Sequence, residues 1–231
     1  MGKTTTLLEK IKDDVRYKEG IHACMNCGAC TAICPAAEFY EYDPRVLINI
    51  VQTQDEEKIE ELLKSDFIWY CGQCMSCKTR CPRNNCPGLI INVLRKVAQE
   101  TGWFTHSKQG RQQLVIKRNI GDTILKYGYC IHPEILKPEK HPEQGPVWEW
   151  IYNNQKEFYT RMNAHLDSYE QGTLRKIRPE VMKELVDIFE ETGGLSFFEC
   201  IEKYSLKKAK EMGYAQHNDN LDEYIKHVES V

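Results

Sequence analysis

The sequence predicts an all-α fold, and three observations lead to this prediction. Apolar residues recur at spacings of three and four, which is the periodicity of amphipathic helices. Aspartate and proline stand where such segments begin, and glycine stands where they end. No segment alternates apolar and polar residues in the way that predicts a β-strand.

Three helices are predicted in the first half of the chain. Asp43 is a capping residue, and the proline after it suits the first helical position. The acidic run 55–57 favours a second helix start through its interaction with the helix dipole. Pro87 opens a third helix, which Gly102 ends with a C-terminal cap.

The second half is predicted to hold a linker between helices. Ser107 caps a helix that runs towards Leu125, and residues 131–146 then contain four prolines, which indicates an extended connection. Helix starts are expected after it at Pro146, Pro179, Ser196 and Leu221.

The expected domain organisation therefore has four parts. These are an N-terminal segment (1–14), a cysteine-rich helical domain (15–130), a proline-rich linker (131–146) and a helical C-terminal extension (147–231).

Composition narrows the class of protein. The chain has 231 residues, enough to bury a core without disulfides, yet 11 of them are cysteine. Its first residues show no apolar signal segment and no apolar run is long enough for a membrane span, so we expect a reduced, cytoplasmic protein with metal-bound thiolates. The net charge of −3 argues against a general nucleic-acid binder.

Eight of the cysteines form one motif that occurs twice. The pattern C-x2-C-x2-C-x3-C-P spans residues 24–35 and again 71–82, an offset of 47 residues. The first copy holds Cys24, Cys27, Cys30 and Cys34, and the second holds Cys71, Cys74, Cys77 and Cys81.

This motif is specific for [4Fe–4S] clusters. In two-cluster proteins its fourth cysteine binds the cluster of the other motif. The motif thus predicts two [4Fe–4S] clusters, the first held by Cys24, Cys27, Cys30 and Cys81 and the second by Cys71, Cys74, Cys77 and Cys34. Since cysteine fills every ligand position, we expect an electron relay with no catalytic residue of its own.

Two zinc sites are the alternative interpretation of the same cysteines. A zinc site takes two C-x2-C pairs, which would leave the third and fourth cysteines of each motif without a role. A zinc-stabilised binding or scaffold protein is therefore the alternative from a different functional class.

The doubled motif with a helical insert resembles the α-helical ferredoxin fold. Over about residues 15–105 the chain resembles the C subunit of heterodisulfide reductase, including the version found in sulfur-oxidising prokaryotes. The segments that carry this resemblance are 24–35, 39–44, 68–74 and 81–83.

The resemblance implies partners and a function. In that family the C subunit is a two-cluster relay between a flavin-bearing A subunit and a catalytic B subunit with CCG motifs. This chain has no CCG motif, which favours the relay over the catalyst. The complex is expected to be cytoplasmic or peripheral to the membrane through its partners, and homo-oligomerisation stays open.

Two further points stay open at the level of sequence. An iron–sulfur subunit of a quinone-linked dehydrogenase is a second alternative, although such chains generally add CCG motifs. Cys86, Cys130 and Cys200 lie outside the motifs, and we expect them to be small packing residues more often than redox thiols.

Overall fold

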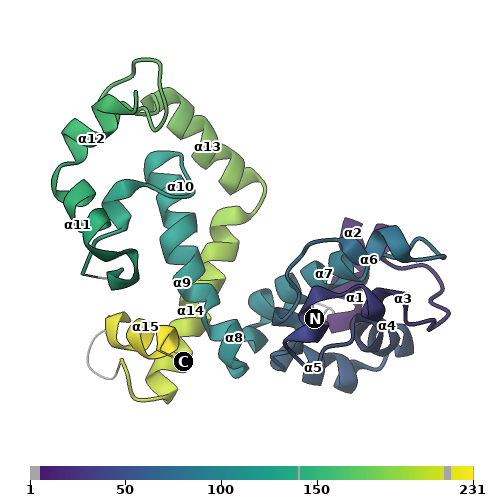
Figure 1. The fold of residues 1–231 in the computed structure, drawn as a ribbon. Helices are drawn as coiled ribbons and strands as arrows, with labels where there is room; N and C mark the ends of the chain where they lie inside the picture. Colours follow the sequence, from purple (N-terminus) through teal and green to yellow (C-terminus); the bar gives the residue numbers. More distant parts are fainter. Residues whose placement is uncertain (1–5, 140, 216–219, 231) are drawn as a thin grey trace. The chain divides into compact units, whose positions relative to one another are not determined.

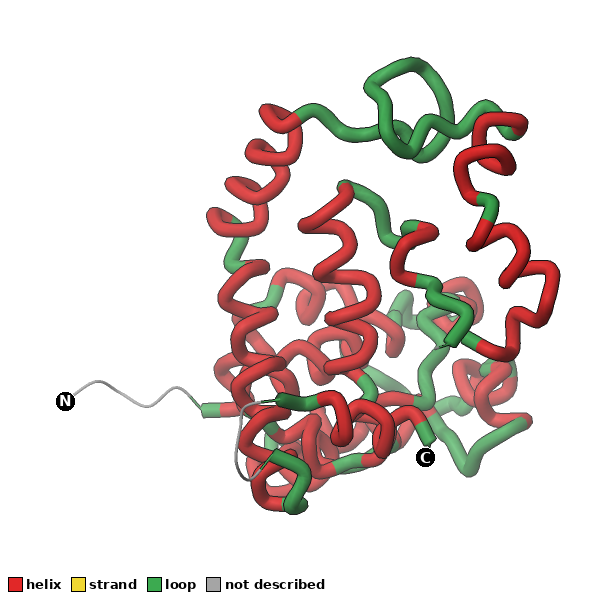
Figure 2. The backbone as a smooth tube through the Cα atoms, turned by 90° about the vertical axis from the view of Figure 1, so that its left-hand side faces the viewer, coloured by secondary structure: helices red, strands yellow, loops and turns green. Residues whose placement is uncertain are grey.

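The computed structural model describes residues 6–139, 141–215 and 220–230, and these residues form helices and loops. No strand occurs in the described ranges, and the only β-type pairing there is a bridge between Ala164 and Thr173. Figure 2 shows the same chain as helices joined by loops. The all-α prediction is confirmed.

The chain divides into two compact units. The first comprises the residues up to Gln113 together with those from Cys200 onward, and the second comprises residues 114–199. The domain boundaries expected from the sequence stay a prediction, and residues 1–5 of the expected N-terminal segment lie outside the described residues.

The first unit is built from short helices around one longer helix, labelled in Figure 1. Its α-helices are α1 (Leu7–Asp13), α2 (Val15–Gly20), α3 (Ala29–Ala32), α4 (Pro44–Thr53), α5 (Glu56–Lys64), α6 (Ser76–Arg80), α7 (Pro87–Thr101), α8 (Lys108–Arg111) and α15 (Asp222–Glu229). Its 3-10 helices are η1 (Pro35–Glu38), η2 (Phe67–Trp69) and η3 (Trp103–His106). Helix α14 (Gly194–Glu211) crosses the boundary between the units.

The second unit contains the remaining helices, of which the first begins at Gln113, the last residue before the boundary. These are α9 (Gln113–Ile116), a π-helical stretch (Lys117–Gly121), α10 (Asp122–Tyr127), η5 (Pro133–Ile135), η6 (Pro142–Gln144), α11 (Gly145–Asn153), α12 (Gln155–Arg161) and α13 (Pro179–Glu191).

The predicted caps of the first unit are present in the structure. The Asp43 carboxylate accepts the backbone N–H of Arg45 at 2.8 Å, and the Asp55 carboxylate caps α5 in the same way. Pro87 opens α7, and Gly102 ends it in the left-handed conformation with φ of +83°. These three helix predictions are confirmed.

Other helix boundaries differ from the prediction. The helix expected from Ser107 to Leu125 is interrupted, because α8 ends at Arg111 and a π-helical stretch separates α9 from α10. Helix α14 begins at Gly194, two residues before the predicted cap at Ser196. Two helices before the first cysteine, α1 and α2, were not expected at all.

Helix α7 forms the centre of the first unit. It contacts α1, α2, α4, α5 and α6. Six of its apolar side chains are at most 1 % exposed: Ile90, Ile91, Val93, Leu94, Val97 and Ala98. Burying one side chain of this size stabilises the fold by about 1.5–3 kcal/mol. Because the N-terminus of α7 follows the second cysteine motif, this core fixes the position of that motif.

Candidate metal centre

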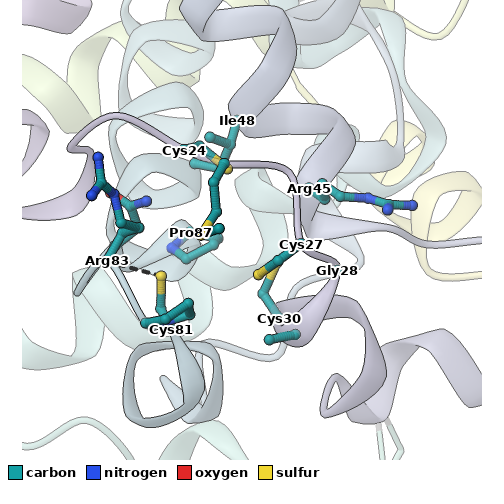
Figure 3. Close-up of a pocket in the computed structure, with 13 residues that line it drawn as sticks. Cys24, Cys27, Gly28, Cys30, Arg45, Ile48, Cys81, Arg83 and Pro87 are labelled. Atoms are coloured by element: carbon teal, nitrogen blue, oxygen red, sulfur yellow. Dashed lines mark hydrogen bonds between the residues drawn. The ribbon is translucent and has the colours of Figure 1, made fainter.

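The eight motif cysteines line two cavities in the first unit. The first cavity, of about 390 Å³ including its open mouth, is lined by Cys24, Cys27, Cys30 and Cys81. The second cavity, of about 370 Å³, is lined by Cys71, Cys74, Cys77 and Cys34. Figure 3 shows the four cysteines of the first cavity. Each cavity thus takes three cysteines from one motif and one from the other.

This grouping is the one that the motif predicts for two clusters. The residues that could hold iron in the first cavity come from the loop before α3, from α3 itself, which contains Cys30, and from Cys81 at the C-cap of α6. Those of the second cavity come from the loop before α6, from α6 itself, which contains Cys77, and from Cys34 between α3 and η1. Bonding of these cysteines to iron stays a prediction.

Left-handed backbone turns shape the loop of each motif. In the first motif Asn26 and Gly28 have φ of +56° and +80°, and in the second Gln73 and Met75 have φ of +55° and +59°. Such values are uncommon for residues other than glycine. They occur at the same positions in both copies, so the two loops follow the same path around their cavities.

Backbone N–H groups of these loops donate to cysteine sulfurs. The N–H of Asn26 donates to Cys24 Sγ and the N–H of Gln73 to Cys71 Sγ, each at 3.4 Å. Hydrogen bonds to cluster sulfurs raise the reduction potential of the cluster. The loops therefore have the donor arrangement that an iron–sulfur site uses.

Two asparagines hold the loops on the neighbouring helices. Asn49 Nδ2 donates to Asn26 Oδ1 at 3.1 Å, and Gln73 Nε2 donates to Asn92 Oδ1 at 2.7 Å. Asn49 is the sixth residue of α4 and Asn92 the sixth residue of α7. The helix after each motif thus anchors the loop of its own motif.

The cavity walls repeat this two-fold pattern. Ile48 of α4 lines the first cavity, Ile91 of α7 and Pro44 of α4 line the second, and Pro87 of α7 lines both. Both prolines open their helix, and both isoleucines lie four residues after that proline. The two halves are therefore related by an offset of 43 residues in these helices and 47 in the motifs.

The fourth cysteine of each motif reaches the opposite cavity through an extended backbone. Cys34 has φ of −77° and ψ of 115°, and Cys81 has φ of −77° and ψ of 117°. Each precedes a proline, which disfavours the helical conformation at the residue before it. The proline therefore ends the short helix and turns the cysteine away from its own motif.

A half-buried arginine supports the chain that enters the second motif. The Arg95 guanidinium donates to the carbonyl oxygens of Ile68, Trp69 and Cys71 at 2.7–3.0 Å. Burial lowers the pKa of Arg95, and the nearby Cys71 acts in the opposite direction. The planar guanidinium can satisfy several carbonyls at once, which an ammonium group cannot do in this geometry.

Burial acts on the free cysteine thiols of both cavities. It raises the pKa of the Cys30 and Cys34 thiols, and it raises the pKa of the Cys77 thiol to about 12. The pKa of Cys74 is lowered instead, by hydrogen bonds from Ser76. A metal bound in the cavity would supply positive charge to thiolates that burial otherwise disfavours.

Basic side chains lie at the first cavity. Arg45 lines this cavity and pairs with Asp43 at 2.7 Å, and Arg83 Nε donates to the Ala23 carbonyl at 3.4 Å. Lys78 and Arg80 are exposed on α6.

The three other cysteines occupy different surroundings. Cys86 is 1 % exposed, and its Sγ lies 3.7 Å from Met75 Sδ beside the second cavity. Cys130 is exposed and Cys200 is half-buried. Among the described residues, no three Cys, His, Asp or Glu side chains converge on one point as ligands of a single metal ion. Nor does any helix in those ranges have the length and apolarity to cross a bilayer.

Two residues at the cavities were not expected from the sequence. Tyr42 lines the second cavity and Asn85 the first, and they are 4 % and 2 % exposed. The Tyr42 hydroxyl and Asn85 Nδ2 are buried with no hydrogen-bond partner among the described residues. Buried polar groups are nearly always hydrogen-bonded, so each cavity offers one buried donor to a group that can accept a hydrogen bond. The cavities therefore fit sulfur-rich clusters that accept hydrogen bonds.

Comparison with known protein families gives an independent result. Residues 19–85 match the family model described as a 4Fe-4S dicluster domain. This range contains both motifs and all eight cysteines that line the cavities.

The chain is also similar to subunits of heterodisulfide reductases from methanogenic archaea. It is 46 % identical over 99 residues to the C subunit of the ferredoxin:CoB-CoM heterodisulfide reductase of Methanosarcina acetivorans, covering 42 % of this chain and 38 % of that protein. It is 30 % identical to the iron–sulfur C subunits of the CoB–CoM heterodisulfide reductases of Methanocaldococcus jannaschii (its second C subunit) and Methanopyrus kandleri. Those two alignments cover 49 % and 52 % of this chain and 54 % and 64 % of the relatives.

The alignments therefore span between about a third and two thirds of these relatives. The resemblance predicted from the motifs is confirmed for that part of the chain. Residues 19–85 are similar to a 4Fe-4S dicluster domain, and the chain that contains them is similar to the C subunit of heterodisulfide reductase.

Proposed function

We propose that this chain is an electron-transfer subunit that holds two [4Fe–4S] clusters. The first cavity would hold one cluster on Cys24, Cys27, Cys30 and Cys81, and the second would hold the other on Cys71, Cys74, Cys77 and Cys34. The observation that carries this proposal is the grouping of eight cysteines around two cavities, four to each. A match to a dicluster domain over the same residues supports it.

The partners belong to the same proposal. The chain would take electrons from a flavin-bearing subunit and pass them to a subunit that carries out thiol–disulfide chemistry. The names of the relatives support this, because they are subunits of heterodisulfide reductases. Reduction of one disulfide consumes two electrons and two protons and releases two thiols, and each bound cluster supplies electrons singly.

The cluster count can be tested by chemical analysis of the full chain purified without oxygen. We expect about eight irons and eight sulfides per chain, with the broad visible absorption of iron–sulfur proteins. About four irons would contradict the two-cluster proposal. A colourless protein that contains zinc would contradict the cofactor altogether and would favour a structural metal site.

Paired substitutions test which cysteines share a cluster. In the proposed assignment, replacing Cys24 and Cys81 together by serine removes ligands of one cluster only, so about four irons should remain. Replacing Cys24 and Cys34 together removes a ligand from each cluster and should affect both. The opposite result would show that each motif holds its own cluster. Cys130→Ser serves as the control, because this exposed cysteine lies outside both cavities.

The partners can be identified by anaerobic purification of the tagged chain from its native host. We expect a flavoprotein and a CCG-motif subunit in stoichiometric amounts. In the purified complex, the iron–sulfur absorption should bleach when the flavoprotein is reduced and recover when a disulfide substrate is added. Recovery with a quinone and not with a disulfide would favour a quinone-linked dehydrogenase instead.

A further inference from the structure

Each cavity contains one buried side-chain donor that has no acceptor among the described residues. In the second cavity this is the Tyr42 hydroxyl, and in the first it is Nδ2 of Asn85. Leaving such a donor unpaired destabilises the fold unless a bound group accepts the hydrogen bond.

The two donors occupy the same position in the two halves of the domain. Tyr42 lies two residues before Pro44, which opens α4, and Asn85 lies two residues before Pro87, which opens α7. Each also follows the cysteine that crosses to the cavity it lines, Cys34 for Tyr42 and Cys81 for Asn85. The two halves of the domain therefore each place one donor at a cavity, two residues before the proline that opens the next helix.

The surroundings of Asn85 orient its amide. Asn85 Oδ1 accepts the backbone N–H of His22, which leaves Nδ2 as the free end of the side chain. The backbone N–H of Asn85 donates to Cys81 Sγ at 3.2 Å, the bond drawn as a dashed line in Figure 3. The residue is thus held against a sulfur of the first cavity.

Aromatic packing orients the Tyr42 ring. Its centroid lies 5.0 Å from that of Phe67 and 6.3 Å from that of Tyr70, and the contact with Tyr70 is edge-to-face. Tyr42 lines the second cavity together with Cys34 and Cys71. Its ring therefore presents the buried hydroxyl at a cavity that is lined by cysteines.

From these observations we infer that Tyr42 and Asn85 each donate a hydrogen bond to a sulfur of one cluster and thereby raise the reduction potential of that cluster. The inference rests on the proposed function, because it requires both clusters. The added electron increases negative charge on the sulfurs, so a donor stabilises the reduced form more than the oxidised form. Each donor acts on one cluster, and its loss therefore lowers one potential and leaves the other unchanged.

The test is a redox titration of the full chain followed by EPR, restricted to proteins with about eight irons. Tyr42→Phe removes only the hydroxyl, and Asn85→Asp keeps the oxygen that accepts from His22 while removing the NH2 group. We expect each variant to shift one couple by about tenfold in its reduction equilibrium, which is about 59 mV for one electron. The two variants should shift different couples, and the double variant should shift both.

Matched controls make the same chemical changes outside the cavities. Tyr40→Phe removes a hydroxyl from an exposed ring, and Asn84→Asp places a carboxylate one residue before Asn85. Both controls should leave the two couples within the error of the wild type. Unchanged couples in Tyr42→Phe or Asn85→Asp would overturn the inference for that residue, whereas a low iron count in the wild type would overturn the proposed function.

A second measurement uses the wild-type protein, so it remains possible if a variant fails to assemble its clusters. Reduced wild-type protein is prepared with 15N in the asparagine side chains and, separately, with deuterium in the tyrosine rings. Pulsed EPR should then detect 15N coupling at one cluster and ring-deuteron coupling at the other. A wild-type spectrum that lacks either coupling would overturn the assignment for that donor.

Discussion

Arg95 is a single side chain that binds several main-chain acceptors near the second motif. Its guanidinium donates hydrogen bonds to three carbonyls, and its Cζ atom lies 5.3 Å from the centroid of the Trp69 ring. Hydrogen bonds from a charged group contribute about 1.5–3 kcal/mol each when the partner would otherwise be left unsatisfied. The position of Cys71 therefore depends on a residue 24 positions further along the chain.

Arg95→Lys should weaken the first unit. A lysine lacks the planar fork that reaches all three carbonyls, so at least one of them would lose its donor and we expect a loss of roughly 3 kcal/mol in the free energy of unfolding. Anaerobic guanidinium denaturation followed by circular dichroism measures it. Arg80→Lys, on the exposed face of α6, is the matched control and should change stability by less than about 0.5 kcal/mol. Equal effects of the two substitutions would contradict the role given to Arg95.

His132 provides a pH-dependent contact in the second unit. It is 5 % exposed, its ring stacks on Tyr127 at 4.0 Å, and its Nδ1 accepts the backbone N–H of Glu134 at 3.4 Å. Burial lowers the pKa of His132 below its ordinary value of 6.5. The unfolded chain thus binds this proton more readily, so the contribution to stability is present above about pH 6.5 and is lost as pH falls through the lowered pKa.

Hydrogen exchange measures this dependence. The protection factors of residues 134–136 should fall between about pH 7.5 and about pH 5 in the wild type. They should vary less in His132→Phe, which keeps an aromatic ring against Tyr127 but cannot titrate. The same pH dependence in both proteins would contradict the assignment to His132.

At the scale of elements, two glycines end helices in the left-handed conformation but have different neighbours. Gly102 follows α7 with φ of +83°, and a Cβ there would lie 2.5 Å from the Tyr204 ring of α14. Gly193 follows α13 with φ of +78°, and a Cβ there would meet nothing within 4 Å. Comparing substitutions at these two glycines therefore separates the cost of backbone strain from the cost of a steric clash.

Alanine at each position should show the difference. Gly193→Ala should cost about 1–2 kcal/mol, the strain of a left-handed residue with a side chain. Gly102→Ala should cost at least about 1 kcal/mol more, because Tyr204 must also move. Native-state hydrogen exchange in the last turns of α7 and α13 gives the two opening free energies. Equal costs would show that Tyr204 does not pack against Gly102 in solution.

At the scale of the whole molecule, the cavities and their cysteines belong to one compact unit. The second unit contains one cysteine, Cys130, and none of the eight predicted ligands. Loss of the clusters should therefore destabilise the first unit, where loops and very short helices contain the cysteines.

Removal of iron by an oxidant and a chelator tests this separation. Hydrogen-exchange protection should fall in the cysteine loops at 21–28, 70–75 and 81–86 and should persist in α11, α12 and α13. Protein carried through the same steps without oxidant is the control. Loss of protection across residues 114–199 would contradict the independence of the second unit.

The parts of the fold that could be predicted are those encoded by residues close together in the sequence. Caps such as Asp43 and Gly102 are local, so the helices they bound were predicted correctly. Helix α1 also has a local signal, a capping box between Thr6 and Glu9, which could have revealed it. The π-helical stretch before α10 has no comparable signal, because apolar spacing does not distinguish π from α turns.

The sequence by itself determined the all-α class and the candidate ligands, because helix caps and cysteine spacing are properties of neighbours along the chain. The motif also predicted which four cysteines belong together, and the tertiary structure groups the same four around each cavity. Only the tertiary structure decided which buried donors line the cavities. Tyr42 and Asn85 are ordinary polar residues in the sequence. The packing of α4 and α7 buries them beside sulfurs contributed by both motifs, and no local pattern encodes that contact.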